Sequence, residues 1–470
     1  MGLAARVAAA TTTFALLAGG GYLVADTYDV VPGFLTNAPV APPPAPFPTA
    51  PGATTGPALT SGLATLPTDA PVPSATSVEK FVAELVDEEK YVGKRVGVLV
   101  TDAATGQGIA GRAATTDFVP ASTAKLLTAA AGLSRVGPDR TLDTTALLAG
   151  STVTLVGGGD MMLAAGAGDP AKVNGRAGLA DLAAQVADAV TAAGLDSVTV
   201  RVDDSLFTGP SVAPSWDPKS VEAGYAAPVT AIAVDVARRT DDTYAQRHPD
   251  PSLAAARDFV RALEEAGVTV TGTAARGNPA EGAAEVGRVS SAPLSEVVGY
   301  FLQTSDNTIT EVVGRIVAIE TGLSGSVQGA TAAVLDAIGA LGVDLTGAKL
   351  ADCSGLGDGS RLSPRLLNEL LLRMVDPGMP ALREAALQMP LAGVSGTLHE
   401  RFTTSDARGR VRAKTGSLPN VSGLAGTVVT ADGRLLVFAV LVDDFPDGNA
   451  WNARATIDKL VTRLAACGCG

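Results

Sequence analysis

The chain has 470 residues, of which 46% are hydrophobic, and a net charge of -13. These values are typical of a globular protein with two or three domains, and the charge argues against nucleic acid or an anionic membrane surface as a partner. The sequence has only two histidines, no Cys-x-x-Cys and no Gly-x-Ser-x-Gly. These absences argue against a zinc site and against a Ser-His-Asp hydrolase.

Residues 1–27 are predicted to form a signal anchor or a secretory signal peptide. The stretch 7–25 is uncharged, and its length is close to the ~20 residues that a helix needs to cross a bilayer. Arg6 precedes this stretch, whereas Asp26 and Asp29 follow it, which predicts that the amino terminus stays inside and the rest lies outside. A clear small-x-small cleavage site is lacking, which favours an uncleaved anchor.

Residues 28–76 are predicted to form a linker. The stretch 32–75 is rich in Pro, Ala, Thr and Gly, a composition that cannot bury a core and favours an extended spacer. An anchor, a spacer and a globular body together predict a protein that is held above a membrane and faces the cell envelope.

The two ends of the body are predicted to build one α+β domain. Four segments have the patterns of a helix, a strand, a hairpin and a closing helix, namely 77–86, 95–101, 423–442 and 452–466. We therefore assign 77–142 and 287–470 to one domain, with an antiparallel sheet flanked by helices. Residues 143–286, with short strands and Ala-rich helices, are assigned to one or more inserted domains.

Ser122-Thr-Ala-Lys125 is a candidate nucleophile with its base. The motif leads into a predicted apolar helix, 124–133, so the hydroxyl of Ser122 would lie at a helix N-terminus, where the dipole favours a developing negative charge. Lys125 lies one turn later on the same face, and a buried lysine near another cation can accept the serine proton. Ser77-Val-Glu-Lys80 has the same spacing, but Ser77 opens a helix and is interpreted as its N-cap.

Ser305-Asp306-Asn307 is predicted to lie on a tight turn between two apolar helices, 294–302 and 309–317. A hydroxyl and an amide at this place can relay a proton and hold a lysine. The alternative is helix capping, for which Thr308 and Glu311 supply a capping box. That capping box would leave Ser305 and Asn307 free to face a ligand.

Lys414-Thr415-Gly416 follows 410–413, which has the pattern of an edge strand. Side chains alternate along a strand, so Lys414 and Gly416 are predicted to face one side and Thr415 the other. Gly416 would let a substrate backbone approach, and Lys414 would offer a positive charge to a terminal carboxylate. The alternative is a lysine at the end of a strand before a turn.

The three motifs, in this order, resemble the signature of the penicillin-recognising serine transferases and hydrolases. The long gap between Ser122 and Ser305 is similar to that of one branch, the class C low-molecular-mass penicillin-binding proteins. The members of this branch are D-alanyl-D-alanine carboxypeptidases that also act as endopeptidases. Further segments that are similar to this branch are 155–160, 203–210, 227–231, 352–356 and 391–398. The resemblance covers roughly 78–466.

The resemblance implies a β-lactamase-like fold and a catalytic role for four residues. Ser122 would attack the peptide bond of a peptidoglycan stem peptide that ends in D-Ala-D-Ala and form an acyl-enzyme, with Lys125 as the base. Ser305 would relay the proton to the leaving amine, and Asn307 would position Lys125 and the substrate. β-Lactams are implied as covalent inhibitors, and no metal or cofactor is expected.

The resemblance also implies a substrate-binding strand. Lys414 and Thr415, followed by Gly416, would bind the terminal carboxylate. The backbone N–H groups of Ser122 and Ser417 would form the oxyanion hole.

Two alternative functions require other sequence features. A β-lactamase of class A needs a glutamate in a Glu-x-x-x-Asn element after Ser-Asp-Asn. The only asparagine between 308 and 413 is Asn368, and position 364 is Pro364, so the element is absent. A non-catalytic envelope binding module would be expected to lack at least one motif residue, and none is lacking.

The three cysteines leave two interpretations open. If the chain is exported, Cys353 could pair with Cys467 or Cys469, which would leave one thiol over. The alternative is three unpaired thiols.

Overall fold

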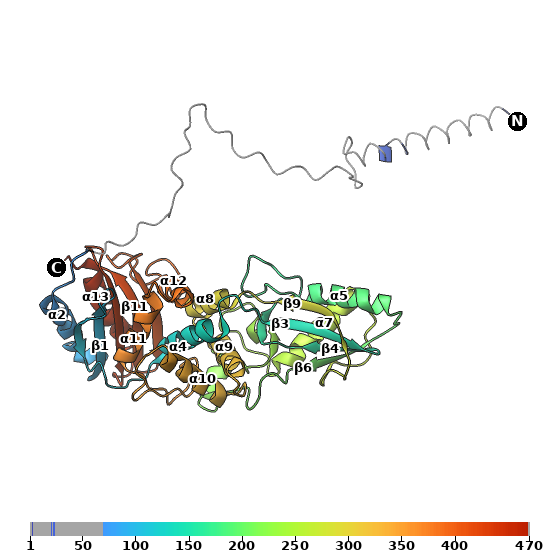
Figure 1. The fold of residues 1–470 in the computed structure, drawn as a ribbon, viewed down its shortest axis with the longest axis horizontal. Helices are drawn as coiled ribbons and strands as arrows, with labels where there is room; N and C mark the ends of the chain where they lie inside the picture. The colour runs from blue at the N-terminus through green and yellow to red at the C-terminus, as the bar shows by residue number, and fades with distance from the viewer. Residues whose placement is uncertain (1, 3–19, 21, 24–68, 469–470) are drawn as a thin grey trace. The chain divides into compact units, whose positions relative to one another are not determined.

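The computed structural model describes residues 2, 20, 22, 23 and 69–468. By its contacts the chain divides into two units, 1–65 and 66–470. Nearly all described residues belong to the second unit, which is compact (Figure 1). The predicted anchor and most of the predicted linker lie outside the described residues. Within the described part of the chain, no helix is both long enough and apolar enough to span a membrane.

A five-stranded antiparallel sheet is built from both ends of this unit, as predicted. Its strands, in spatial order, are β10 (Val411–Leu418), β11 (Val421–Val429), β12 (Leu435–Asp443), β1 (Arg95–Asp102) and β2 (Gly108–Arg112). The amino-terminal strand β1 therefore pairs with β12, which lies more than three hundred positions later, and β10 remains at one edge.

Helices cover both faces of this sheet (Figure 1). The helices α2 (Ala75–Val86) and α13 (Ala450–Ala466) pack on one face, and α11 (Pro364–Val375) packs on the other. Along β12, Phe438 and Val440 belong to the core beneath α2 and α13, whereas Ala439 belongs to the core beneath α11. This period-two alternation is the expected pattern for a strand that is covered on both faces. The predicted α+β class is confirmed.

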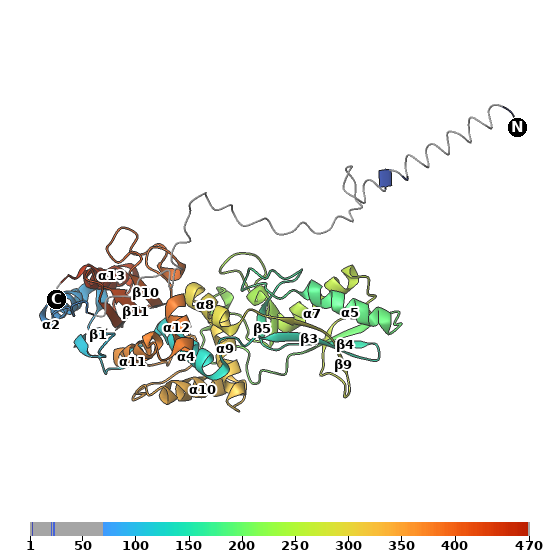
Figure 2. The same cartoon turned by 45° about the horizontal axis from the view of Figure 1, so that its top comes forward.

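The middle of the unit is helical (Figure 2). It contains a 3-10 turn and five helices, namely η1 (Ala121–Ala124), α4 (Lys125–Ala131), α8 (Leu294–Thr304), α9 (Asn307–Glu320), α10 (Val327–Ala340) and α12 (Pro380–Gln388). Every residue of α4 is buried, which fits a helix that is apolar around most of its circumference and lies at the centre of a core. The two sheets lie at the two ends of this helical layer (Figure 2).

The second sheet is mixed and comes from the middle of the sequence. Its spatial order is β8 (Ala275–Arg276), β6 (Thr199–Asp203), β4 (Thr152–Val156), β3 (Asp143–Ala149) and β9 (Ala284–Ser290). The helices α5 (Leu179–Ala192) and α7 (Pro251–Glu265) share its apolar core. The chain enters this sheet at Asp143 and leaves it at Ser290. The limits of the inserted part, 143–286, stay a prediction.

The remaining elements are short. They are α3 (Glu89–Val92), η2 (Gly132–Val136), β5 (Asp160–Leu163), α6 (Pro218–Glu222), β7 (Ile232–Val234), η3 (Asp235–Ala237) and η4 (Gly396–Leu398). The strands β5 and β7 pair in parallel and connect the second sheet to the helical middle.

Two local predictions are wrong. Ser74, and not Ser77, is the N-cap of α2, because the Ser74 hydroxyl accepts a hydrogen bond from the Ser77 backbone N–H at 3.3 Å. Cys353 is a free and fully buried thiol, so it does not pair with a carboxy-terminal cysteine. Cys467 is disulfide-bonded, which also excludes three unpaired thiols.

Candidate active site

The three motifs meet where the edge strand β10 lies against η1 and against the turn between α8 and α9. Ser122 lies on η1, Lys125 begins α4, Ser305 and Asn307 flank the helix–helix turn, and Lys414 lies in the middle of β10. Hydrogen bonds between side chains join all three segments, because Lys125 bonds to Asn307 and Lys414 bonds to Ser305.

Lys125 makes hydrogen bonds to three different segments at the site. Its side chain is fully buried, and Nζ donates to Ser122 Oγ at 2.9 Å, to Asn307 Oδ1 at 2.7 Å and to the Ser354 carbonyl oxygen at 2.8 Å. Three acceptors match the three donor positions of an ammonium group. When the amine is neutral, one of these contacts can reverse, so that Ser122 donates its proton to Lys125.

Burial changes the pKa of both lysines in the site. Burial lowers the pKa of Lys125 to about 8, although the charges of Asp352, Glu311 and Asp306 act in the opposite direction. Burial also holds the pKa of Lys414 well below its usual value, and the nearby charge of Lys125 lowers it further. A base with a pKa near the working pH is what general-base catalysis requires.

The turn between α8 and α9 presents the second motif. Ser305 ends α8 in the left-handed conformation, with φ 59° and ψ 31°. Asp306 is the N-cap of α9, because its side chain accepts from the Ile309 N–H at 2.9 Å. A single cap therefore fixes the turn and leaves Ser305 and Asn307 on its surface toward β10 and α4.

The predicted capping box of Thr308 and Glu311 is wrong. Thr308 Oγ1 accepts instead from the Ala227 N–H at 2.9 Å, and Glu311 Oε1 accepts from the backbone N–H groups of Cys353 and Ser354. The helix begins two residues earlier than predicted, so both side chains point into the core instead of toward their own helix end.

Asn307 joins the site to the middle of the sequence. Its Nδ2 donates to the Tyr225 carbonyl oxygen at 2.8 Å, while its Oδ1 accepts from Lys125. These two bonds fix the orientation of the amide. Sequence analysis missed Tyr225, because a backbone carbonyl carries no signal in residue type.

Strand β10 supplies the third motif. Lys414 is fully buried, and its Nζ donates to Ser305 Oγ at 2.9 Å and to the Thr415 carbonyl oxygen at 3.0 Å. On the other side of the strand, Thr415 Oγ1 donates to Thr397 Oγ1 at 2.9 Å. Thr397 is a second residue that the sequence analysis missed.

Gly416 permits a close approach between two segments of the chain, β10 and η1. A Cβ atom at this position would lie 2.7 Å from the Pro120 carbonyl oxygen and 3.2 Å from Thr123 Cγ2. Glycine therefore lets β10 lie directly against η1, which brings the strand next to Ser122. The predicted approach of a substrate backbone to this strand stays a prediction.

The free edge of β10 begins after its first half. Val411 and Ala413 use their outward carbonyl and N–H groups to bond with residues 390–392. Backbone groups alternate along a strand, so Thr415 and Ser417 direct their own N–H groups outward beyond that contact. Ser417 is exposed, which places its N–H at the open side of the site.

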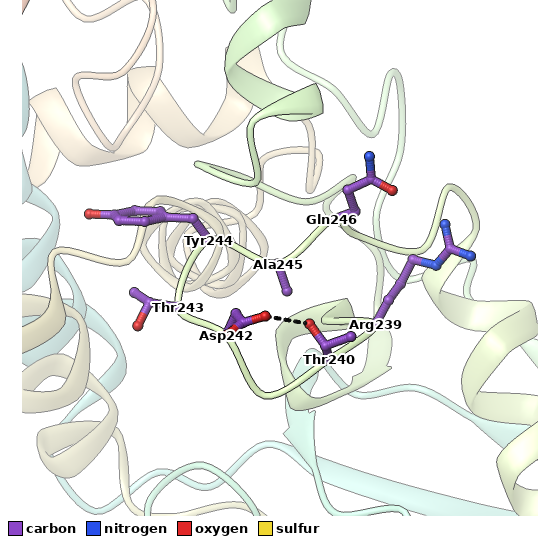
Figure 3. A pocket seen from close by; sticks show the side chains of 7 residues that line it. All are labelled: Arg239, Thr240, Asp242, Thr243, Tyr244, Ala245 and Gln246. Carbon is purple, nitrogen blue, oxygen red and sulfur yellow. Dashed lines mark hydrogen bonds between the residues drawn. The ribbon is translucent and has the colours of Figure 1, made fainter.

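A separate hollow of about 730 Å³ lies on the loop from Arg239 to Gln246 (Figure 3). It contains no motif residue, and its Thr240 and Asp242 side chains bond to each other at 3.2 Å. The loop reaches the site through Tyr244, whose ring meets the Tyr225 ring edge-on with centroids 5.2 Å apart.

Two further observations bear on alternative chemistry. Asn368 is buried in α11 and its Nδ2 donates to the Leu99 carbonyl oxygen at 3.1 Å, so it has a structural role. Among residues 69–468, no three His, Cys, Asp or Glu side chains are grouped so that they could hold a metal ion.

Comparison with known proteins identifies the family. The family model of the D-Ala-D-Ala carboxypeptidase 3 (S13) family matches residues 78–248 and 236–464. A carboxypeptidase of Mycobacterium tuberculosis is 35% identical over 441 residues, which cover 91% of this chain and 90% of that protein. Carboxypeptidase DacB of Mycolicibacterium smegmatis is 37% identical over 383 residues, which cover 79% of this chain and 80% of that protein.

The fold has a counterpart among solved structures. Penicillin-binding protein 4 of Haemophilus influenzae has a TM-score of 0.67 at 20% identity, and the match covers 81% of this chain and 98% of that chain. This likeness confirms the expected penicillin-binding fold. Because the family model matches most of the body that carries all three motifs, the chain belongs to the D-Ala-D-Ala carboxypeptidase 3 (S13) family.

Proposed function

We propose that Ser122 forms the acyl-enzyme through which this serine D-alanyl-D-alanine carboxypeptidase cleaves peptidoglycan stem peptides. The observation that supports this best is that Lys125 Nζ lies 2.9 Å from Ser122 Oγ and 2.7 Å from Asn307 Oδ1. A base that contacts its nucleophile and is oriented by a third group is what serine acyl transfer requires. With a pKa of about 8, about a tenth of the Lys125 amines are neutral at pH 7.

The proposed reaction begins when Ser122 Oγ attacks the carbonyl carbon between the two D-alanines and Lys125 takes the serine proton. The oxyanion accepts hydrogen bonds from the N–H groups of Ser122 and Ser417, and such a donor contributes about 3–4 kcal/mol in other enzymes. Ser305 relays the proton that Lys125 took to the leaving amine, the C–N bond breaks, and D-alanine departs. Water then hydrolyses the ester and regenerates Ser122.

Lys414 and Thr415 are proposed to bind the terminal carboxylate of the substrate. In the free enzyme, burial and the charge of Lys125 disfavour the protonated form of Lys414. An incoming carboxylate has the opposite effect, because a nearby negative charge stabilises an ammonium group. Substrate binding would therefore charge Lys414 while it contacts Ser305 Oγ, the hydroxyl that relays the proton.

β-Lactams are expected to acylate the same serine. The Glu-x-x-x-Asn element that class A β-lactamases use is absent, so we expect the penicilloyl ester to persist. Peptidoglycan lies outside the cytoplasm, and the enzyme therefore acts there. Anchoring through residues 7–25 and endopeptidase cleavage of cross-links by the same acyl-enzyme are further parts of the proposal.

The test is covalent labelling of the full chain with a fluorescent penicillin, together with release of D-alanine from a peptide that ends in D-Ala-D-Ala. We expect Ser122→Ala to lose both the label and the activity. Ser77→Ala is the matched control, because Ser77 and Lys80 have the same spacing, and it should keep both. Labelling that persists in Ser122→Ala, or that is absent from folded wild-type protein, would contradict the proposal.

A further inference from the structure

The loop that holds the third acceptor of Lys125 is fixed by two buried carboxylates. Residues 352–357 place the Ser354 carbonyl oxygen 2.8 Å from Lys125 Nζ. The N–H groups of Cys353 and Ser354 both donate to Glu311 Oε1, at 2.9 and 2.8 Å. Asp352 accepts from two further N–H groups of the same loop. The loop thus directs its N–H groups toward the carboxylates and its Ser354 carbonyl toward the base.

The loop has little freedom to move. Gly355 adopts a φ of +75°, and a Cβ atom there would lie 1.9 Å from the Ala121 carbonyl oxygen. Trp216 Nε1 donates to Asp352 Oδ2 at 2.7 Å, which ties the start of the loop to the middle of the sequence. The loop is therefore packed directly against η1, the turn that carries the nucleophile.

Glu311 lies one helical turn after Asn307 on α9. Side chains four positions apart share a face of a helix, so one face of α9 carries both the amide that holds Lys125 and the carboxylate that holds the loop. Glu311 is 1% exposed, and its second oxygen, Oε2, has no hydrogen-bond partner in the described part of the chain. Burial, assisted by the charge of Asp352, raises the pKa of Glu311 to about 8, so this carboxyl becomes charged over the same pH range in which Lys125 becomes neutral.

Stability alone does not explain why a glutamate lies at position 311. A buried carboxyl group with one unpartnered oxygen is costly, and an amide oxygen would accept the same two N–H groups without a charge. What distinguishes glutamate from glutamine here is the negative charge that it can place near Lys125. The other charged or titratable groups that face this cluster are Asp352, Cys353, Asp306, Arg315 and Lys414.

We propose that Glu311 is a positioning residue for acylation: it anchors the loop whose Ser354 carbonyl holds Lys125, and its charge sets how readily that amine accepts the proton of Ser122. The proposal rests on the function proposed above for Ser122 and Lys125. It separates two effects. The hydrogen bonds to the loop fix the geometry at every pH, whereas the charge fixes the pH at which Lys125 becomes an effective base.

Two substitutions distinguish these effects. Glu311→Gln keeps an oxygen for the loop and removes the charge that Glu311 acquires near pH 8. The neutral form of Lys125 is then favoured in that range, and the midpoint of the acylation profile moves to lower pH. Glu311→Ala removes the loop contacts as well, so acylation falls at all pH values. The matched control is Glu320→Gln, the same chemical change at the exposed end of the same helix.

The experiment measures the second-order rate constant of acylation by fluorescent penicillin between pH 5 and 9.5, on the full chain. For Glu311→Gln we expect the midpoint of the rate profile to fall by about half a pH unit, with a plateau near that of the wild type. For Glu311→Ala we expect a loss of about tenfold or more, because small displacements of catalytic groups are costly. Glu320→Gln should match the wild type.

An unshifted profile for Glu311→Gln would overturn the proposal, whether or not its plateau falls, because Glu311 would then be a structural anchor alone. Should Glu311→Ala fail to fold, the Glu311→Gln profile decides by itself. Ser122→Ala is labelled in parallel. If it still reacts, the proposed function has failed, whereas an unlabelled Ser122→Ala with an unshifted Glu311→Gln contradicts only the role of Glu311.

Discussion

Two buried amines share this site, and the difference between their surroundings separates their roles. Lys125 has three acceptors and three acids nearby, which together keep its pKa at about 8 in spite of burial. Within residues 69–468, the hydrogen bonds that Lys414 donates go to the Ser305 hydroxyl and the Thr415 carbonyl oxygen. The nearest compensating charge for Lys414 would be that of the substrate. Lys125 is therefore suited to exchange protons in the free enzyme, and Lys414 is suited to sense the substrate carboxylate.

Thr397 is expected to set the affinity for the carboxylate through Thr415. In the free enzyme Thr415 Oγ1 donates its one proton to Thr397 Oγ1 at 2.9 Å. When a carboxylate takes that proton, the bond can reverse, so that Thr397 donates to Thr415 and holds its hydroxyl toward the substrate. Replacing Thr397→Val should raise KM for a peptide with a free carboxyl terminus about two- to tenfold, the effect of one hydrogen bond, with a smaller change in kcat. Steady-state release of D-alanine measures this effect.

Thr397→Ser is the matched control for that substitution, because it keeps the hydroxyl and should keep KM near the wild-type value. A peptide whose terminal carboxylate is amidated should bind equally to both variants. The role of Thr397 is disproved when Thr397→Val and Thr397→Ser give the same KM for the free acid.

Residue type and spacing predicted the motif residues of this site. They did so where a side chain acts on another residue close to it in the sequence. Ser122 and Lys125 are one turn apart, so their contact is a consequence of helical geometry. Thr397, Tyr225 and Ser354 contribute one hydroxyl and two carbonyl oxygens from distant segments. Such groups occur in every sequence, and only the folded chain selects which of them reach the site.

At the scale of elements, the close contact between β10 and η1 should be sensitive to a single methyl group. In Gly416→Ala, the new Cβ would lie 2.7 Å from the Pro120 carbonyl oxygen, closer than such atoms come in folded proteins. The strand would have to move away from η1, which would shift Ser417 relative to Ser122. We expect acylation to slow by about tenfold or more, as is common when catalytic groups are displaced.

The control for that substitution is Gly108→Ala on β2, at the opposite edge of the same sheet. Its new Cβ would meet only Leu99 Cδ1, at an ordinary distance of 3.7 Å. Acylation rates and Tm are measured for both variants. Equal rates for Gly416→Ala and Gly108→Ala would show that the close contact does not set the position of the strand.

The start of α9 illustrates what sequence alone could not decide. Asp306 and Thr308 are both good N-cap residues, and Thr308 has Glu311 at the right spacing for a capping box. The choice is made by partners elsewhere, because Ala227 donates to Thr308 and the loop at 353–354 donates to Glu311. Local propensity predicted the helix and its apolar face, and tertiary contacts fixed its first residue.

At the scale of the whole molecule, the middle of the sequence contributes directly to the site. The turn Asp235–Ala237 has three consecutive residues with positive φ, between 44° and 58°, a strained conformation for non-glycine residues. This turn leads into Arg238, whose Nη2 lies 3.6 Å from Asp306 Oδ2. Together with the Tyr225 carbonyl, Arg238 supports the Ser-Asp-Asn turn from outside the catalytic sheet. Periodicity could assign strands and helices to this region, but it could not predict these contacts.

The junction between the second sheet and the helical middle should make stability depend on pH. Asp160 is 1% exposed and accepts from the Met162 N–H at 2.7 Å, next to Gly159, which packs against Ile316 of α9. Burial raises the pKa of Asp160 to about 7, whereas the pKa in the unfolded chain is about 3.9. Between these values the unfolded chain releases a proton that the folded protein keeps.

The free energy of unfolding should therefore fall as pH rises from about 4 to about 7, by about 1.4 kcal/mol per unit at most, and this contribution should be constant above pH 7. Asp160→Asn keeps the acceptor for Met162 and has no carboxyl group to ionise. We expect this variant to be more stable than the wild type at pH 8 and to differ little from it at pH 4.

Urea unfolding at pH 4 and pH 8 measures this difference. Asp169→Asn is the matched control, because Asp169 makes the same bond to a backbone N–H two residues later, that of Ala171, but its side chain is partly exposed and contacts Lys172. It should not show the gain in stability at pH 8 that we expect of Asp160→Asn. An Asp160→Asn variant that is less stable than the wild type at pH 8 would mean that the folded protein carries an ionised Asp160. The carboxylate would then stabilise the junction instead of opposing it.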